Sequence, residues 1–236
     1  MFKLLIGSLI LSLGLNANDI FEIKKEKFTI EYSLEKKGAT KVYYTLGNNV
    51  NDLNIKKRQD FYKDNALDFP YATTPEDYTN TGFDRGHMAA DATFDYDYDS
   101  LNDTYSMANI VPQYPNVNRE VWKNIEELER YNAVQFGSLY VENIIKYDNK
   151  EILKKLPIEE ILPERKFKNT EHRAKYIAKY ERDSINLEEK EIYVPTYFIK
   201  KMENTEHNFK ECYKVPNQKN LDISNIEQYK IDCSKI

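Results

Sequence analysis

The chain has 236 residues, of which 41% are hydrophobic and 31% are charged. This composition is typical of a folded protein and excludes a disordered chain, and the length allows one large domain or two small ones. The formal net charge of −5 excludes nucleic-acid binding through overall charge, because such binding depends on neutralised phosphates. Any contact of that kind requires a local basic patch.

The first residues are typical of a secretory signal. Met1-Phe2-Lys3 carries one positive charge, residues 4–15 are apolar or small, and Ala17 is a small residue at the end of the run. The pattern predicts cleavage after Ala17 and a mature chain of residues 18–236 that is periplasmic or secreted and not membrane-bound. The apolar run is short for a membrane span, which needs about 20 residues. A buried N-terminal helix is the alternative.

In the first half of the chain, residues 28–32 and 41–46 alternate apolar and polar side chains and are expected to be strands. Lys37-Gly38 is the expected turn between them. The stretch 47–80 is polar, with a short helix expected at 57–62. Residues 81–87 are rich in turn formers and then extended.

A helical pattern covers residues 118–131, with Val121, Trp122, Ile125 and Leu128 on one stripe and Asn116 as the expected cap. Glu127 and Glu129 fit its solvated face.

Strands are expected at 133–140 and 192–199, where Pro195 indicates a bulge or an edge. The stretch 144–190 is strongly charged and partly helical. The pattern predicts the α+β class, with residues 18–236 forming a single domain that carries a charged insertion around 144–190.

The two cysteines are Cys212 and Cys233. In an exported protein such a pair predicts a disulfide bond, which stabilises the fold by about 3 kcal/mol for a loop of this size. Two buried thiols are the alternative. A zinc site has little support, because His87, His172 and His207 are scattered and no Cys-x-x-Cys occurs.

The residues Asp84-Arg85-Gly86-His87 carry the first chemical hypothesis. In an extended segment Arg85 and His87 project to the same side. Phosphodiester cleavage needs a base with a near-neutral pKa and a cation for the charge that develops on phosphorus. A nearby arginine lowers the histidine pKa and keeps the imidazole unprotonated. A surface turn with an ordinary histidine is the alternative.

The helix 118–131 carries the second chemical hypothesis. Asn118, Trp122 and Glu126 follow an i, i+4, i+8 ridge. Trp122 is expected to be buried, with Asn118 and Glu126 at its margin. One amide oxygen suffices for Mg²⁺, which keeps several waters. Eight residues of helix rise about 12 Å, so Glu126 is expected to act on a metal-bound water rather than on the metal.

Together these segments resemble the DNA/RNA non-specific endonuclease family, the ββα-metal nucleases that include endonuclease G. Thr-Gly-Phe-Asp-Arg-Gly-His at 81–87 resembles its signature, and Asn-Ile-Val-Pro-Gln at 109–113 resembles a second element. Asn-x-x-x-Trp-x-x-x-Glu at 118–126 is similar to the family's helix. Residues 136–140 and 194–200 are similar to its later strands. The resemblance extends in order over most of residues 28–233.

The resemblance implies His87 as the general base and Asn118 as the single protein ligand of magnesium. It implies that Glu126 holds metal-bound water, that Arg85 stabilises the transition state, and that Asn109 positions the site. The implied fold is a central antiparallel sheet flanked by helices.

Other matches are looser. Arg58 resembles a second phosphate-contacting arginine, and Arg130 is a weaker candidate. Ala90 stands where the family commonly has proline, and Lys230 where glycine is usual. Residues 144–190 have no evident counterpart.

The implied function is an exported, magnesium-dependent endonuclease, with manganese as a possible substitute. It hydrolyses DNA and RNA without sequence specificity through phosphate contacts and leaves 5′-phosphates, and a homodimer is left open. Two alternatives stay open: a catalytically inactive nucleic-acid-binding protein on the same fold, and a phosphodiesterase for small substrates.

Overall fold

The computed structural model describes residues 19–236, so the predicted signal segment lies outside the described residues. Its main element is an antiparallel sheet in the order β1-β2-β3-β6-β7-β8-β9. The strands are β1 (Ile20–Lys24), β2 (Phe28–Ser33), β3 (Gly38–Gly47), β6 (Ser138–Lys146), β7 (Tyr197–Asn204), β8 (Phe209–Pro216) and β9 (Lys230–Ile231). A separate two-stranded ribbon pairs β4 (Asp84–His87) with β5 (Ile110–Gln113).

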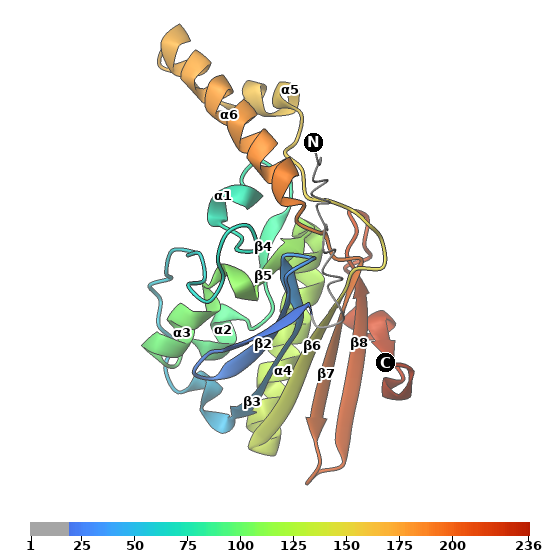
Figure 1. Ribbon diagram of the computed structural model, residues 1–236. Helices are drawn as coiled ribbons and strands as arrows, with labels where there is room; N and C mark the ends of the chain where they lie inside the picture. Colours follow the sequence, from blue (N-terminus) through green and yellow to red (C-terminus); the bar gives the residue numbers. More distant parts are fainter. Residues whose placement is uncertain (1–18) are drawn as a thin grey trace, which may run out of the picture.

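One face of the sheet is covered by a long helix (Figure 1). A π-helical turn, η3 (Val117–Trp122), runs directly into α4 (Lys123–Phe136). The expected apolar stripe is confirmed, because Val121, Trp122 and Ile125 are fully buried in the main core against β2, β3 and β6. Alternate residues of β6 point into the same core, which explains the alternating burial along that strand.

The other helices lie around the ribbon or project from the body. They are α1 (Pro75–Tyr78), α2 (Asp91–Phe94), α3 (Tyr98–Thr104), α5 (Ile158–Ile161) and α6 (Thr170–Lys190). Figure 1 shows α5 and α6 extending away from the sheet. Single turns of 3₁₀-helix occur at η1 (Asn48–Asn51), η2 (Met107–Asn109), η4 (Leu162–Glu164), η5 (Ile226–Tyr229) and η6 (Cys233–Lys235). Among residues 19–236, none of the helices combines the length and the apolar character that crossing a bilayer requires.

Two expectations near α4 differ from the structure, one for a strand and one for a helix cap. The strand expected at 133–140 is wrong over its first half, because α4 continues to Phe136 and ends at Gly137, whose φ of 73° suits glycine. Asn116 is not a side-chain cap: its Nδ2 donates to the carbonyl of Gln218 at 3.2 Å.

Two further expectations fail because distant backbone supplies the hydrogen bonds. No helix forms at 57–62, since Tyr62 exchanges hydrogen bonds with the backbone of residues 105 and 107. The strand expected at 192–199 begins only at Tyr197. Residues 192–194 bond to residues 36 and 151–153 instead, and Pro195 lacks the N–H that a central strand must donate.

One disulfide bond lies near the C-terminal end of the chain. The expected disulfide bond is confirmed between Cys212 of β8 and Cys233 of η6. The bond links η6 to β8, next to the point where β9 pairs with β8 at the edge of the sheet.

Candidate active site

The β4–β5 ribbon presents Arg85 and His87 on one side. In the ladder His87 lies opposite Ile110 and Asp84 lies opposite Gln113. The ring of Phe61 lies 5.4 Å from the His87 ring centroid, and the Arg85 guanidinium carbon lies 5.4 Å from the same Phe61 ring. Both side chains therefore contact one aromatic surface, as expected for alternate residues of a strand.

Gly86, between them, faces the opposite side and the fully buried Gln113. A Cβ atom at position 86 would overlap the Oε1, Cδ and Cγ atoms of Gln113. Only glycine therefore lets the ribbon close over this side chain, which explains the glycine within the signature.

Replacing Gly86 with alanine is expected to destabilise the fold by about 1–3 kcal/mol, the usual cost of an added methyl group in a packed interior. Urea unfolding measures the change. The double variant Gly86→Ala/Gln113→Ala removes the overlapping atoms and should regain part of the loss. A single variant as stable as the unaltered protein would contradict this packing.

Buried polar atoms without partners gather on the ribbon. Among residues 19–236 they include Arg85 Nε, His87 Nε2 and both amide atoms of Gln113. An unpaired buried polar atom costs roughly 1–3 kcal/mol, so folded proteins keep few of them. The concentration of these four atoms on three residues of the ribbon marks this place as one adapted for more than stability.

His87 is half-buried between aromatic rings. Tyr105 meets it edge to face at 5.2 Å, and the Tyr105 and Phe61 rings lie 5.0 Å from each other, so the three rings form one cluster. Within the described part of the chain neither ring nitrogen forms a hydrogen bond, and Nε2 is inaccessible to solvent. Burial lowers the pKa of His87 below its usual 6.5; the nearby Asp91 carboxylate opposes this, and Arg58 adds to it. The imidazole is consequently neutral at neutral pH.

Asp91 connects His87 to Arg58. Its carboxylate accepts a hydrogen bond from the Tyr105 hydroxyl at 2.9 Å and lies 3.4 Å from Arg58 Nε. Arg58 also donates to Asp95 at 3.0 Å and to the carbonyl of Ile55 at 3.0 Å. Each of the three guanidinium nitrogens has one of these partners, and Nη1 and Nη2 each keep a second N–H. Arg58 therefore belongs to the carboxylate cluster beside His87, and its contact with a phosphate stays a prediction.

Asn118 lies beside the strand that carries His87. Its Nδ2 donates to Asp84 Oδ2 at 3.0 Å. Arg119 holds the same carboxylate with two charge-assisted hydrogen bonds, of 2.8 and 2.6 Å. Because Nδ2 is fixed by Asp84, the amide oxygen of Asn118 is oriented, and within residues 19–236 it has no hydrogen-bond partner. Asp84 is a positioning residue that the sequence reasoning included only as part of the motif.

Glu126, two turns further along the helix, is half-buried. Burial raises its pKa to about 8, with Lys200 opposing and Glu129 reinforcing the rise. The carboxyl is therefore largely protonated at neutral pH unless a cation lies nearby. The Asp91 carboxylate raises the pKa of both Glu126 and His87.

Beneath Glu126 lies a buried ion pair between Glu129 and Lys200. The expectation that Glu129 is solvated is wrong: both side chains are 0% exposed, whereas Glu127 is exposed as expected. Tyr44 donates to Glu129 at 2.9 Å, and Lys200 lies 4.9 Å from the Trp122 ring. A buried charge on this helix requires a partner of opposite charge, and Lys200 of β7 supplies it. Local sequence patterns do not predict this pairing, because the two residues are far apart in the chain.

Asn109 is fully buried and acts on the backbone after His87. Its Oδ1 accepts from the amide of Ala89 at 2.8 Å, and its Nδ2 donates to the carbonyls of Ala89 and Thr104, both at 2.9 Å. Nδ2 of Asn143 in β6 donates to the carbonyl of Met88, one residue before Ala89, at 2.6 Å. Asn109 therefore fixes the chain that follows the histidine and has no free group for substrate.

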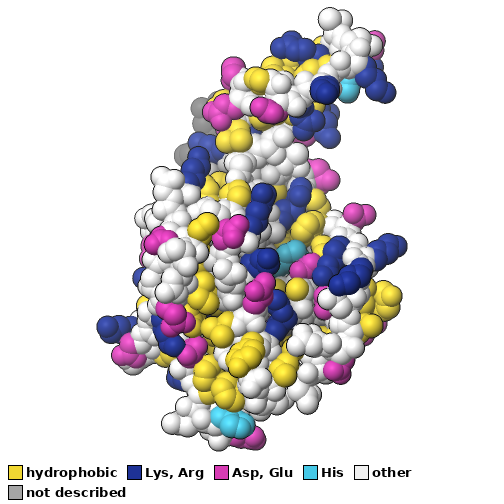
Figure 2. All heavy atoms as spheres, turned by 180° about the vertical axis from the view of Figure 1, so that it is seen from behind, with side chains coloured by type: hydrophobic (Ala, Val, Ile, Leu, Met, Phe, Trp, Pro, Cys, Tyr) yellow, Lys and Arg dark blue, Asp and Glu magenta, His cyan; other side chains and the backbone are white. Residues whose placement is uncertain are grey.

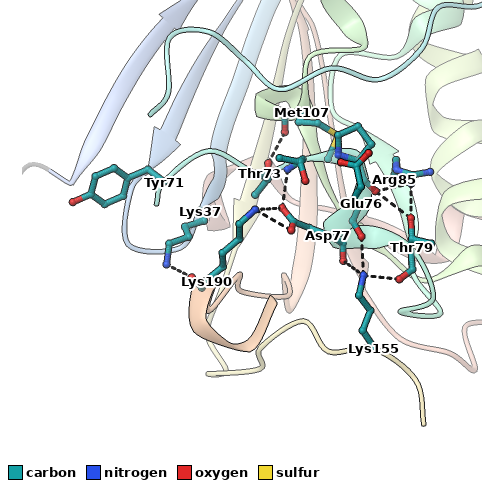
Figure 3. A network of polar contacts seen from close by, with 12 residues as sticks. Lys37, Tyr71, Thr73, Glu76, Asp77, Thr79, Arg85, Met107, Lys155 and Lys190 are labelled. Carbon is teal, nitrogen blue, oxygen red and sulfur yellow. Dashed lines mark hydrogen bonds and ion pairs between the residues drawn. The ribbon is translucent and has the colours of Figure 1, made fainter. Parts of the chain in front are cut away.

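Arg85 is fixed by α1. Its Nη2 donates to the Pro75 carbonyl at 2.6 Å and to Thr79 Oγ1 at 3.3 Å (Figure 3). Within residues 19–236 its Nη1 has no partner. Arg130, half-buried on α4, donates to Thr93 Oγ1 at 3.4 Å, which ties α4 to α2.

The donor set suits a hard divalent cation that keeps most of its water. The amide oxygen of Asn118, which is oriented and has no partner among the described residues 19–236, is an oxygen ligand of the kind Mg²⁺ accepts. Among residues 19–236 there is no cluster of three or more His, Cys, Asp or Glu side chains that could hold a metal. A cation at Asn118 would therefore take its other ligands from water and from a substrate phosphate.

The fold and the site together define a class. The histidine lies on a two-stranded ribbon, the ribbon is hydrogen-bonded to a helix through Asp84 and Asn118, and the helix lies on an antiparallel sheet. This is the arrangement of an α+β ββα-metal nuclease. The chain belongs to the DNA/RNA non-specific endonuclease family, whose profile matches residues 7–236. This is a family of phosphodiester hydrolases, and the chain is endonuclease G-like within it.

Relatives and one solved structure agree with this assignment. Mitochondrial endonuclease G of Bos taurus is 34% identical over 82 residues, which cover 35% of this chain and 27% of that protein. A nuclease of Nostoc sp. is 32% identical over 125 residues, covering 52% and 45%. The matches thus span less than half of these relatives. A chain in the crystal structure of the EndoG/EndoGI complex superposes with a TM-score of 0.69 at 19% identity, covering 91% of this chain and 81% of that one, and so shares the fold.

Proposed function

We propose that this chain is an exported, magnesium-dependent endonuclease that hydrolyses phosphodiester bonds in DNA and RNA without sequence specificity and leaves 5′-phosphates. The observation that carries the proposal is the geometry of one strand. Its last residue is the unpartnered His87, and its first residue, Asp84, orients the amide of Asn118.

His87 is the general base in this proposal. Its Nε2 is closed off from solvent, so Nδ1 is the nitrogen that takes the proton from the attacking water. The lowered pKa keeps the ring neutral before the step. Asp91, close enough to oppose that shift, stabilises the imidazolium that forms, and Asn109 holds the backbone that fixes the ring's position.

Arg85 is the cation for the charge that develops on the phosphate, with Nη1 as the nitrogen left to donate. Asn118 would hold a magnesium or manganese ion through its amide oxygen, with Glu126 orienting water beside it. When bound, such a cation neutralises the scissile phosphate and stabilises the leaving 3′ oxygen. Contacts to phosphates rather than to base edges account for cleavage without sequence specificity.

The disulfide bond supports export, because such bonds persist in oxidising compartments. Together with the apolar N-terminal run it favours a periplasmic or released protein.

The purified protein is expected to degrade both plasmid DNA and RNA with Mg²⁺ present, and excess EDTA should abolish the cleavage. Adding back Mg²⁺ or Mn²⁺ should restore it, and the fragments should accept a 5′ label only after phosphatase treatment.

Unchanged cleavage in EDTA would overturn the metal requirement. Binding of DNA with no metal-dependent cleavage would favour the inactive binding protein. Hydrolysis of small nitrophenyl esters without polymer cleavage would favour the phosphodiesterase for small substrates.

A further inference from the structure

The projecting α5–α6 segment (residues 158–190), here called the arm, carries eight Lys and Arg and eight Asp and Glu, and its cations are concentrated in its middle part. Residues 162–182 contain seven Lys and Arg against three Glu, whereas the whole chain has a net charge of −5. Figure 2 shows Lys and Arg side chains gathered on the arm and, on the same face, in the middle of the molecule below it. This is the local basic surface that the overall charge does not provide.

Most of these cations have no carboxylate partner. Lys175 pairs with Glu171 and Arg182 lies near Asp183. Within residues 19–236 the others form no ion pair, and all are exposed. These five residues, here called the arm cluster, are Arg165, Lys166, Lys168, Arg173 and Lys179. Unpaired exposed cations repel one another, so their grouping favours an anionic partner.

A cavity of about 230 Å³ lies where the arm meets the body, lined by Arg165, Tyr176 and Lys179 from the arm and by Thr79 and Asn80 from the body. The Arg165 guanidinium lies 4.4 Å from the Tyr176 ring, which holds it at the cavity wall. The Tyr176 hydroxyl in turn accepts from Asn80 Nδ2 at 3.1 Å.

Two charged side chains of the cavity, Lys155 and Asp183, already have partners within residues 19–236. Lys155 donates to the carbonyls of Glu76 and Thr79 at 2.7 Å, and Asp183, also on the wall, lies 3.6 Å from Arg182. Arg165 and Lys179 remain as the cations available to an anion.

The cavity is connected to the catalytic strand by direct contacts. Thr79, which lines it, accepts a hydrogen bond from Arg85 (Figure 3). At the base of α6, Lys190 forms two hydrogen bonds of 2.7 and 2.9 Å with Asp77 of α1. The helix that holds Arg85 is thus the same helix that anchors the arm, so the arm has a fixed position relative to the active site.

We propose that the arm is a second nucleic-acid-binding site, in which the arm cluster contacts backbone phosphates of the strand that leaves the catalytic centre past Arg85 and Thr79. This rests on the proposed endonuclease function and adds a preference for long polymers. The 21 residues of α6 extend about 30 Å, which corresponds to about nine nucleotides at 3.4 Å each.

The test compares an arm variant, Arg165→Gln/Lys168→Gln/Arg173→Gln/Lys179→Gln, with a charge-matched control, Lys24→Gln/Lys27→Gln/Lys210→Gln/Lys235→Gln. All eight positions are exposed, so both proteins should fold. Cleavage kinetics are measured in Mg²⁺ on an oligonucleotide of about six nucleotides and on a duplex of about 40 base pairs. Duplex binding is measured across a salt series on the His87→Ala background.

For the arm variant we expect the KM for the long duplex to rise at least roughly tenfold, and the slope of log affinity against log salt to decrease by about 2, which corresponds to about two lost phosphate contacts. Kinetics on the hexanucleotide should stay unchanged, as should all values of the control variant.

Three results would overturn the proposal. The first is a salt slope and long-duplex KM equal to those of the control. The second is an equal loss on both substrate lengths, which would mean that the arm acts on the catalytic centre through α1. The third is that the arm variant binds DNA as tightly as the control variant but no longer binds anionic phospholipid vesicles. Failure of the endonuclease function is a separate outcome: the unaltered protein would then cleave neither substrate, while the salt-dependent binding still reports on the arm.

Discussion

Replacing His87 with alanine is expected to lower the rate of DNA cleavage by about a thousandfold, within the range that a general base contributes. No other histidine within residues 19–236 can take over the proton transfer, because His172 lies on α6 and His207 lies between β7 and β8. His207→Ala is therefore the matched control and should retain full activity. The comparison is made by single-turnover cleavage in Mg²⁺, after circular dichroism has shown that both variants are folded.

The acid limb of the pH–rate profile tests the same assignment. Burial lowers the His87 pKa, so the neutral base persists below pH 6.5, and the rate should fall only as pH drops through the lowered value. Removing the Asp91 charge with Asp91→Asn takes away the group that opposes this shift, and should move the limb to still lower pH. Near-normal cleavage by His87→Ala, or a limb that Asp91→Asn moves upward, would refute His87 as the base.

Replacing Lys200 with methionine is expected to destabilise the fold by about 3–5 kcal/mol, because it leaves the Glu129 carboxylate buried without its cation. Lys200 also opposes the raised pKa of Glu126, so its loss should protonate that carboxyl further and slow cleavage at neutral pH. Urea unfolding measures the first effect, and cleavage well below the unfolding midpoint measures the second.

The double variant Lys200→Met/Glu129→Leu separates charge burial from packing. With both charges removed, most of the stability should return, although the hydrogen bond from Tyr44 is lost. Removal of the exposed pair Lys175–Glu171, whose side chains are 74% and 72% exposed, should have no measurable effect. A Lys200→Met protein as stable as that control would show that the pair contributes nothing to the fold.

The geometry of the β4–β5 ribbon could be predicted because its determinants are adjacent in the sequence. Arg85, Gly86 and His87 need only an extended backbone to place the cation and the imidazole on one side. The stripe of Val121, Trp122 and Ile125 likewise follows from helical periodicity alone, and it is buried as expected.

Long-range contacts decided the rest of the site. Glu129 has the helical position of a surface residue, yet it is buried because Lys200, 71 residues away, supplies a partner from β7. Asp91 and Arg58 contact each other across 33 residues of chain, and no local pattern marks the carboxylate that faces His87. Sequence periodicity reports which residues share a face, but a charge's environment depends on which distant element packs against it.

By itself the sequence determined the family, the shared side of Arg85 and His87 on β4, the buried face of the helix and the disulfide bond, since each follows from local spacing or from residue chemistry. Only the tertiary structure decided where Asn118 points, which charges are buried and how α6 is anchored beside Arg85. Those features depend on hydrogen bonds and ion pairs between segments far apart in the chain, and such pairings form only when the sheet brings the segments together.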